Sequence, residues 1–140
     1  MIYLEQTDFA PVMRDEFLNA IIDSDPAVLN EAELQTMALV ESWLGTLYDM
    51  AAIWATNGND RNRYLVKLMV SLIRYDIYQR LPKNRNISND VQAGKDEAMD
   101  WLKRVSAGEI TAQLPAKQVD QKPVTNTRWG SEPRKRWNTI

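Results

Sequence analysis

Few residues in this sequence are of a type that could do chemistry. None of the 140 residues is histidine or cysteine, which removes the commonest general base and any thiolate nucleophile. Asp76 is the one acid that falls within an apolar helical pattern, and a buried carboxylate with a shifted pKa can act as an acid or base. No second group accompanies it. We interpret Asp76 as half of a structural ion pair with Arg80, Arg63 being the other available cation, and expect no enzyme activity.

Sites for phosphates and metal ions are not indicated either. Five glycines are too few and too scattered for a phosphate-binding loop. Asp23-Ser24-Asp25 resembles the start of a calcium-binding loop, but no glycine or glutamate follows at the required positions. Pro26 follows directly, so we interpret these residues as a helix stop. We expect no cofactor and no metal site.

Charge is distributed unevenly along the chain. Residues 1–50 carry ten acids and one base, a net charge of −9, whereas residues 117–140 carry six bases and two acids, a net charge of +4. An acidic body and a basic tail suggest that one copy could dock onto another. The alternative is that acids at helix starts and bases in a solvated tail carry no further meaning.

The C-terminal segment combines these bases with aromatic residues. From Thr111 onward helical periodicity fades, and Pro115, Pro123 and Pro133 leave no face that could pack. We predict an extended arm over 116–140 that binds a protein surface, because tryptophan and arginine often anchor interfaces. The predicted interface residues are Arg128, Trp129, Gly130, Arg134, Lys135, Arg136 and Trp137. An alternative function is a small DNA-binding or regulatory helical protein that places this basic arm on phosphate.

The rest of the chain has the pattern of an all-α protein. Apolar residues make up 44 % of the sequence, enough for a core, and 140 residues suit one domain. Apolar spacing predicts helices over 12–22, 30–50, 61–81 and 90–106, although 49–55 could extend the second helix or leave it. We therefore expect a compact bundle of about four helices over 1–115. No apolar run is long enough for a membrane span, and we expect no signal peptide.

Individual residues define the ends and faces of these helices. Asn30 is the expected N-cap of the second helix, with Glu33 reaching back to it. Leu34, Met37, Ala38, Glu41, Leu44 and Tyr48 mark one face of that helix, with Val40 and Leu47 beside it, and this wide stripe predicts burial on more than one side. Asn57-Gly58 predicts a turn, and Gly108 a left-handed helix end. The third helix should be central, and the predicted core consists of Leu44, Leu68, Met69, Leu72, Ile73, Trp101 and Leu102.

Several residue strings, in this order, resemble a known family. They are Asp25-Pro-Ala-Val-Leu-Asn-Glu-Ala-Glu33, Tyr48-Asp49 with Ile53-Trp54, Thr56-Asn-Gly-Asn-Asp-Arg-Asn62, Asp76-Ile-Tyr78, Ala98-Met-Asp-Trp-Leu102, Gly108-Glu-Ile110 with Leu114-Pro115, and Arg128-Trp-Gly-Ser-Glu-Pro-Arg-Lys-Arg136. Together they resemble the small neck or head–tail connector proteins of Mu-like and related long-tailed phages, in the version found in phages of Bacteroidetes-type hosts. Trp129 departs from the pattern, where a phenylalanine or similar residue is expected.

The resemblance implies a structural virion protein. Members of such a family form a ring, usually of twelve copies, under the portal protein, and join the DNA-filled capsid to the tail. The implied partners are the portal, copies of the same chain and the next neck or tail-completion protein, with DNA only as channel contents and no membrane. The implied location is the virion neck, after synthesis in the host bacterial cytoplasm.

Overall fold

A computed structural model describes residues 1–14, 16, 18–20, 25, 27–80 and 89–117 of the chain. Three long helices make up its main body: α2 (Ala27–Leu44), α4 (Arg63–Gln79) and α5 (Asn89–Ser106). The short helix α3 (Met50–Trp54) and the 3-10 turns η1 (Gln6–Phe9) and η2 (Gly58–Asp60) complete the named elements. The described residues contain one isolated bridge and no strand. The predicted all-α class is therefore confirmed.

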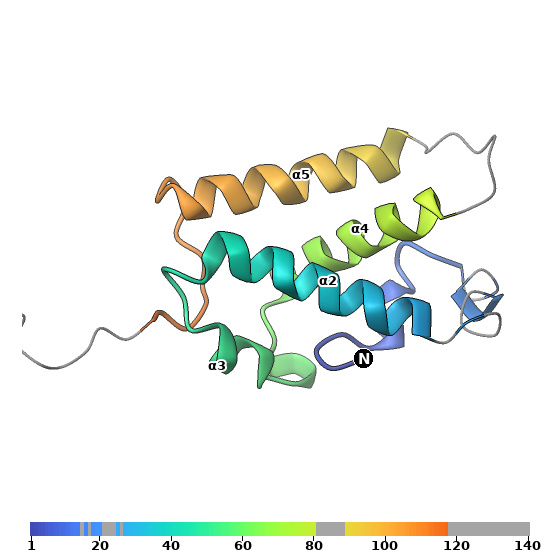
Figure 1. Cartoon of the computed structure of the whole chain (residues 1–140), viewed down its shortest axis with the longest axis horizontal. Coiled ribbons are helices and arrows are strands. Elements are labelled where there is room, and N and C mark those ends of the chain that lie inside the picture. The colour runs from blue at the N-terminus through green and yellow to red at the C-terminus, as the bar shows by residue number, and fades with distance from the viewer. Residues whose placement is uncertain (15, 17, 21–24, 26, 81–88, 118–140) are drawn as a thin grey trace, which may run out of the picture.

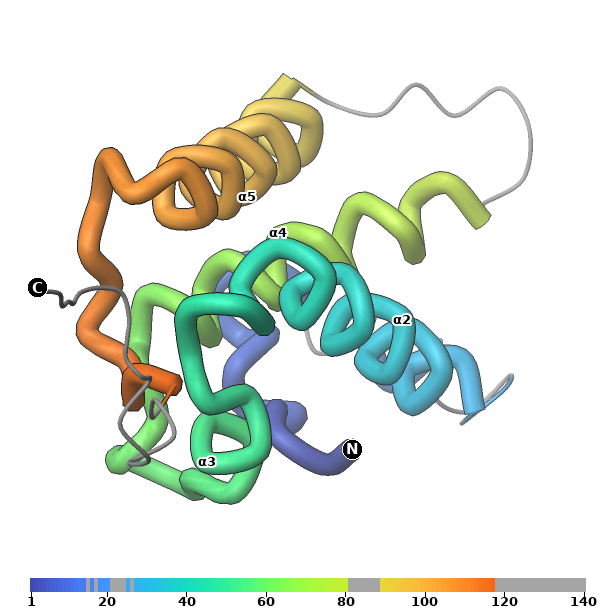
Figure 2. The backbone as a smooth tube through the Cα atoms, turned by 60° about the vertical axis from the view of Figure 1, so that its left-hand side comes forward, coloured from blue at the N-terminus to red at the C-terminus, as the bar shows by residue number. Residues whose placement is uncertain are grey.

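Helix α4 is the central element of the body. It contacts α2, α5 and η1, and Figures 1 and 2 show α2 and α5 lying against it. Its apolar residues recur every three or four positions, which places them on one face of a helix. Its buried residues include the four that were predicted as core, and they are Leu65, Leu68, Met69, Val70, Leu72, Ile73 and Ile77. The prediction that the third helix is central is thus confirmed.

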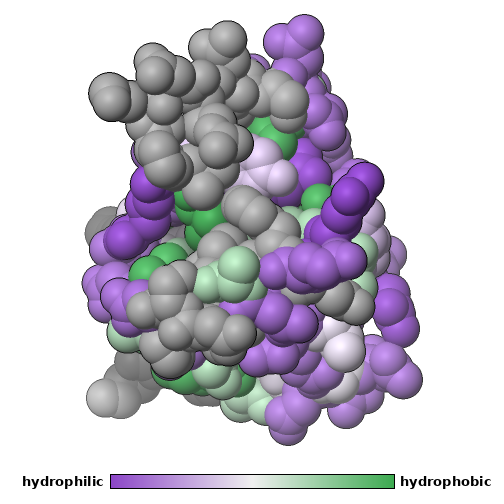
Figure 3. All heavy atoms as spheres, turned by 90° about the vertical axis from the view of Figure 1, so that its right-hand side faces the viewer, coloured by the Kyte–Doolittle hydropathy of each residue, from purple (hydrophilic) through white to green (hydrophobic). Residues whose placement is uncertain are grey.

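Most of the predicted core is also confirmed. Leu44 and Leu102 are buried together with the residues of α4, whereas Trp101 is only partly buried and packs against the core from its edge. Trp101 lies edge-on to Tyr64, with ring centroids 5.4 Å apart. On the end of the molecule shown in Figure 3, hydrophilic side chains form most of the described surface and hydrophobic atoms show in small patches between them.

Replacing one core side chain should measurably weaken this body. Leu72 is 5 % exposed and packs in the core cluster, so Leu72→Ala removes three carbons and leaves a cavity. We expect the free energy of unfolding to fall by roughly 2–5 kcal/mol. Urea unfolding followed by circular dichroism measures this change. An unchanged midpoint would mean that α4 does not pack as described.

The second predicted helix differs from the observed one at both ends. Helix α2 begins at Ala27, so Asn30 lies inside the helix and is not its N-cap. The N–H of Ala27 instead donates to the Asp25 carboxylate over 3.1 Å. The helix ends at Leu44 rather than at residue 50. Asp49 then starts the separate helix α3, because its side chain accepts from the N–H of Ala52.

The predicted face of α2 is only partly buried. The buried residues of the helix are Leu29, Ala32, Glu33, Thr36, Met37, Val40 and Leu44. Of the predicted face, Met37, Leu44 and Tyr48 are buried, whereas Leu34, Ala38 and Glu41 are exposed. The apolar pattern of this helix is wide, so it allows two registers about one residue apart. Burial of Glu33, described below, selects the observed one.

The first predicted helix differs from the structure, whereas the end of the last one agrees with it. The predicted helix over 12–22 is only partly described: residues 16 and 18–20 are helical, while Val12 and Met13 lie in a turn after η1. At the other end of the body, α5 ends as predicted at a left-handed glycine, Gly108, with a φ of +84°. The N–H of Glu109 donates to the carbonyl of Arg104 over 2.9 Å, which satisfies the end of the helix.

Candidate functional site

The predicted interface residues cannot be placed on the body. Arg128, Trp129, Gly130, Arg134, Lys135, Arg136 and Trp137 all lie outside the described residues. The described chain ends with residues 112–117, which run back along the α2–α3 turn. The N–H of Asp49 donates to the carbonyl of Pro115 over 2.9 Å, and the N–H of Lys117 donates to the carbonyl of Leu47 over 3.0 Å. The segment held by the body therefore extends two residues past the predicted boundary at 115.

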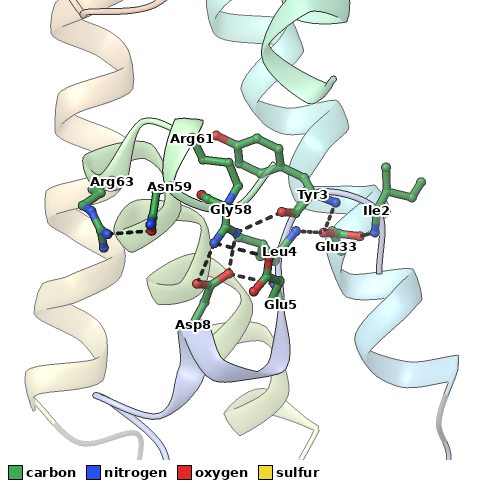
Figure 4. Close-up of polar contacts among 10 residues, drawn as sticks. All are labelled: Ile2, Tyr3, Leu4, Glu5, Asp8, Glu33, Gly58, Asn59, Arg61 and Arg63. Carbon is green, nitrogen blue, oxygen red and sulfur yellow. Dashed lines mark hydrogen bonds and ion pairs between the residues drawn. The ribbon is translucent and has the colours of Figure 1, made fainter. Parts of the chain in front are cut away.

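Glu33 holds the N-terminal segment against α2. Its side chain is 1 % exposed and accepts three backbone hydrogen bonds, from Ile2 over 2.5 Å, Tyr3 over 2.9 Å and Leu4 over 2.6 Å (Figure 4). An ionised carboxylate accepts such bonds with both oxygens, which compensates for its burial. The helix register therefore positions Glu33 to anchor a segment about thirty residues away in sequence. The sequence pattern did not indicate this role.

Arg61 forms a second anchor for the same segment. Its guanidinium makes a bidentate pair with the Asp8 carboxylate, at 2.6 Å and 3.1 Å. It also donates to the carbonyls of Tyr3 over 3.0 Å and of Gly58 over 2.9 Å (Figure 4). The Arg61 side chain is 9 % exposed. These bonds join η1, the N-terminal segment and the Gly58 turn, whose φ of +55° suits glycine.

The Asp8–Arg61 pair predicts a pH dependence of stability. Burial raises the pKa of Asp8. The hydrogen bonds from Arg61 and from the N–H of Glu5, together with the charge of Arg61, lower this pKa by more, so it lies below its usual 3.8. A carboxyl whose folded-state pKa is lowered stabilises the fold above its unfolded pKa, and this contribution is lost as the pH falls through the folded value. Urea unfolding of the wild type and Asp8→Asn should therefore differ at neutral pH and converge below about pH 4. A gap that stays constant down to about pH 2 would contradict this.

Asp76 lies where α2, α4 and α5 meet. Burial raises its pKa, and the charges of Lys95 and then Arg80 partly oppose this rise. Within the described part of the chain no ion pair joins Asp76 to a cation within 4.0 Å. Arg80 therefore acts on Asp76 through its charge and not through a close contact, and Lys95 has the larger effect.

A pocket of about 100 Å³ opens beside Asp76. Its walls come from three helices: Gln35, Thr36 and Leu39 of α2, Leu72, Tyr75 and Asp76 of α4, and Lys95 and Met99 of α5. Lys95 Nζ lies 4.5 Å from the centre of the Tyr75 ring. The pocket combines apolar walls with a carboxylate, which suits a side chain that is both apolar and a hydrogen-bond donor. No cluster of metal-ligating side chains occurs within the described ranges.

Comparison with known protein families identifies the family of this chain. The family model described as Bacteriophage Mu, Gp36 matches residues 3–129, which is most of the chain. The chain belongs to the bacteriophage Mu Gp36 family. No curated protein and no solved structure matches it. The Mu Gp36 match extends from the anchored N-terminal segment to Trp129, twelve residues beyond the described body.

Membership of the Mu Gp36 family supports a phage structural or morphogenesis protein. The expected phage origin is therefore confirmed, while the neck position and the portal stay predictions. In the part of the chain that the structure describes, no helix is both long and apolar enough to cross a membrane.

Proposed function

We propose that this chain is a head–tail connector subunit that acts by assembly and not by catalysis. Copies of it would form a ring under the portal protein, continue the DNA channel and contact the next neck or tail-completion protein. The observation that carries this proposal is the Mu Gp36 match over residues 3–129. That match includes residues 116–129, the first part of the predicted arm, and ends before Arg134, Lys135, Arg136 and Trp137.

The described fold suits a subunit that functions by assembling with other proteins. The N-terminal segment is fixed by Glu33 and Arg61, and the start of the arm is fixed by Leu47 and Asp49. Both ends of the described body are thus held by specific hydrogen bonds. A rigid body from which an arm continues can meet two neighbours in a ring, because head-to-tail contacts use two different surfaces of each subunit.

Deleting the gene in the phage tests this function. We expect filled heads and complete tails that fail to join, and supplying the full-length chain should restore joined particles. Electron microscopy of lysates counts the three species. Normal joined particles without the chain would overturn the proposal, as would defective head shells or defective tails.

A salt titration distinguishes the DNA-binding alternative. A chain that binds DNA through its six C-terminal bases should lose affinity steeply with salt, by a slope of about −0.9 for each phosphate contacted. A connector subunit should bind duplex DNA weakly as a free chain. Fluorescence anisotropy at several salt concentrations, with a variant that neutralises Arg134, Lys135 and Arg136 as the control, separates the two.

A further inference from the structure

Helix α2 has an exposed flank that is both apolar and acidic. Leu34 is 47 % exposed and lies outside the buried stripe of the helix. Glu31, one turn before it, is also exposed. The sequence of α2 contains no basic residue, and the helix lies on the outside of the body, in front of α4 in Figure 1. A partner for this face should therefore be apolar and basic.

The pocket at Asp76 adjoins this face. Leu39, Leu72 and Met99 supply apolar walls, and the Asp76 carboxylate supplies a half-buried acceptor. Gln35 lines the same pocket and donates to the Glu31 carboxylate over 3.1 Å. One carboxylate thus lies in the pocket, with Lys95 also in the lining, and another carboxylate lies at its rim. An indole ring would gain apolar contact from the walls of this pocket. A guanidinium beside the ring would find hydrogen-bond acceptors in the carboxylates.

The sequence outside the described residues contains this pair of groups twice. Arg128-Trp129 and Arg136-Trp137 repeat the same dipeptide eight residues apart. Tryptophan and arginine are the residues that most often dominate binding energy at interfaces. No Arg-Trp pair occurs elsewhere in the chain.

The arm can reach a neighbouring copy. Lys117 lies at the C-terminal end of α2, where its ammonium donates to the carbonyl of Gly45 over 3.4 Å. Twelve residues separate Lys117 from Trp129, which reach at most about 40–43 Å. Helix α2 has 18 residues and is about 27 Å long. The reach exceeds the length of the helix, so Trp129 can reach α2 of its own copy or of an adjoining copy, and the experiment below distinguishes the two.

We propose that the Arg-Trp segment over residues 128–137 of one copy docks on α2 of a second copy, with a tryptophan ring in the Asp76 pocket. The arginines pair with Asp76 and Glu31, and Leu34 covers the adjoining apolar contact. This inference rests on the proposed ring, which places identical copies side by side. It names the surface that receives the arm.

Nuclear magnetic resonance of the full-length, ¹⁵N-labelled chain tests the docking. The five tryptophans give five indole N–H signals, so two report on the arm. On raising the concentration from about 20 μM to 2 mM, a range that brackets weak binding, we expect the signals of Trp129 and Trp137 to shift together with the amides of Leu34, Gln35 and Leu39. Shifts that do not change with concentration would mean that the arm occupies its own subunit, which overturns the proposal.

Paired variants locate the contact. Glu31→Lys combined with Leu34→Lys reverses the charge of the face at exposed positions, and should weaken the self-association by at least about tenfold. Val12→Lys is the matched control, because Val12 is 38 % exposed but lines a different pocket, between η1 and α4. Equal weakening by both variants, or no concentration-dependent shift at all, would overturn the docking. Neither result bears on the gene-deletion experiment, so failure of this inference is distinguishable from failure of the connector function.

Discussion

Glu33→Ala should be the most destabilising substitution outside the apolar core. It leaves the N–H groups of Ile2, Tyr3 and Leu4 without their acceptor, and two of these bonds are buried. Each unsatisfied buried donor costs about 1–3 kcal/mol. We therefore expect a loss on the order of 3–5 kcal/mol, measured by urea unfolding.

Hydrogen exchange tests the same anchoring at individual amides. The amides of Tyr3 and Leu4 should be protected in the wild type and exchange freely in Glu33→Ala, because their acceptor is gone. Glu31→Ala is the matched control: it lies on the same helix, is exposed, and should change stability by less than about 0.5 kcal/mol. Equal stability of the two variants, with Tyr3 and Leu4 still protected, would show that Glu33 does not anchor the segment.

Truncation after Lys117 should abolish joining of heads to tails while leaving the body folded. The cut removes both Arg-Trp pairs but keeps the hydrogen bonds of Pro115 and Lys117 to the α2–α3 turn. We expect stability within about 0.5 kcal/mol of the full chain. Loss of two tryptophan anchors, each contributing about 2 kcal/mol or more, should lower arm-dependent binding at least about 100-fold. Unfolding and counts of joined particles measure the two effects.

A second truncation provides the control. Ending the chain after Leu114 also removes the acceptor of the Asp49 N–H and the donor to the Leu47 carbonyl. This shorter chain should be less stable by roughly 1–2 kcal/mol. If the chain that ends at Lys117 is destabilised as much as the chain that ends at Leu114, residues after Lys117 contribute to the stability of the body. If particles assemble normally after the cut at Lys117, the arm is dispensable.

Local patterns predicted the elements whose signals are unambiguous. In helix α4 the apolar residues Leu65, Leu68, Met69, Leu72, Ile73 and Ile77 recur every three or four positions, so the buried face followed directly from their spacing. The turn at Gly58 and the end of α5 at Gly108 followed from residues that tolerate positive φ. In these elements the local sequence pattern and the tertiary packing favour the same structure.

The errors occurred where long-range contacts decide the outcome. Glu33 was predicted as a capping residue because a glutamate three positions after an asparagine is a local signature. Its actual partners are the amides of residues 2–4, about thirty positions away, and no periodicity in the sequence indicates them. The same contact turns the Glu33 side of α2 inward, so that Leu34 and Glu41 of the predicted wide stripe are exposed while Met37 and Leu44 are buried. Arg61 was missed for the same reason, since its partner Asp8 lies far away in the sequence.

Asp76 was singled out from the sequence as half of an ion pair with Arg80. The structure places it half-buried in the lining of a pocket with Lys95, and no ion pair within 4.0 Å joins it to Arg80 in the described part of the chain. The pocket around it depends on how three helices meet, which a sequence pattern does not determine. The arm residues remain a prediction from composition, because they lie outside the described part of the chain.

Cryo-electron microscopy of the neck in joined phage particles tests the connector function most directly. We expect a closed ring of copies between portal and tail, into which the body formed by α2, α4 and α5 fits as a rigid unit. Each copy should contact the portal on one side and the next neck protein on the other. Absence of this chain from the neck, or its presence only in the head shell or the tail tube, would contradict the connector function.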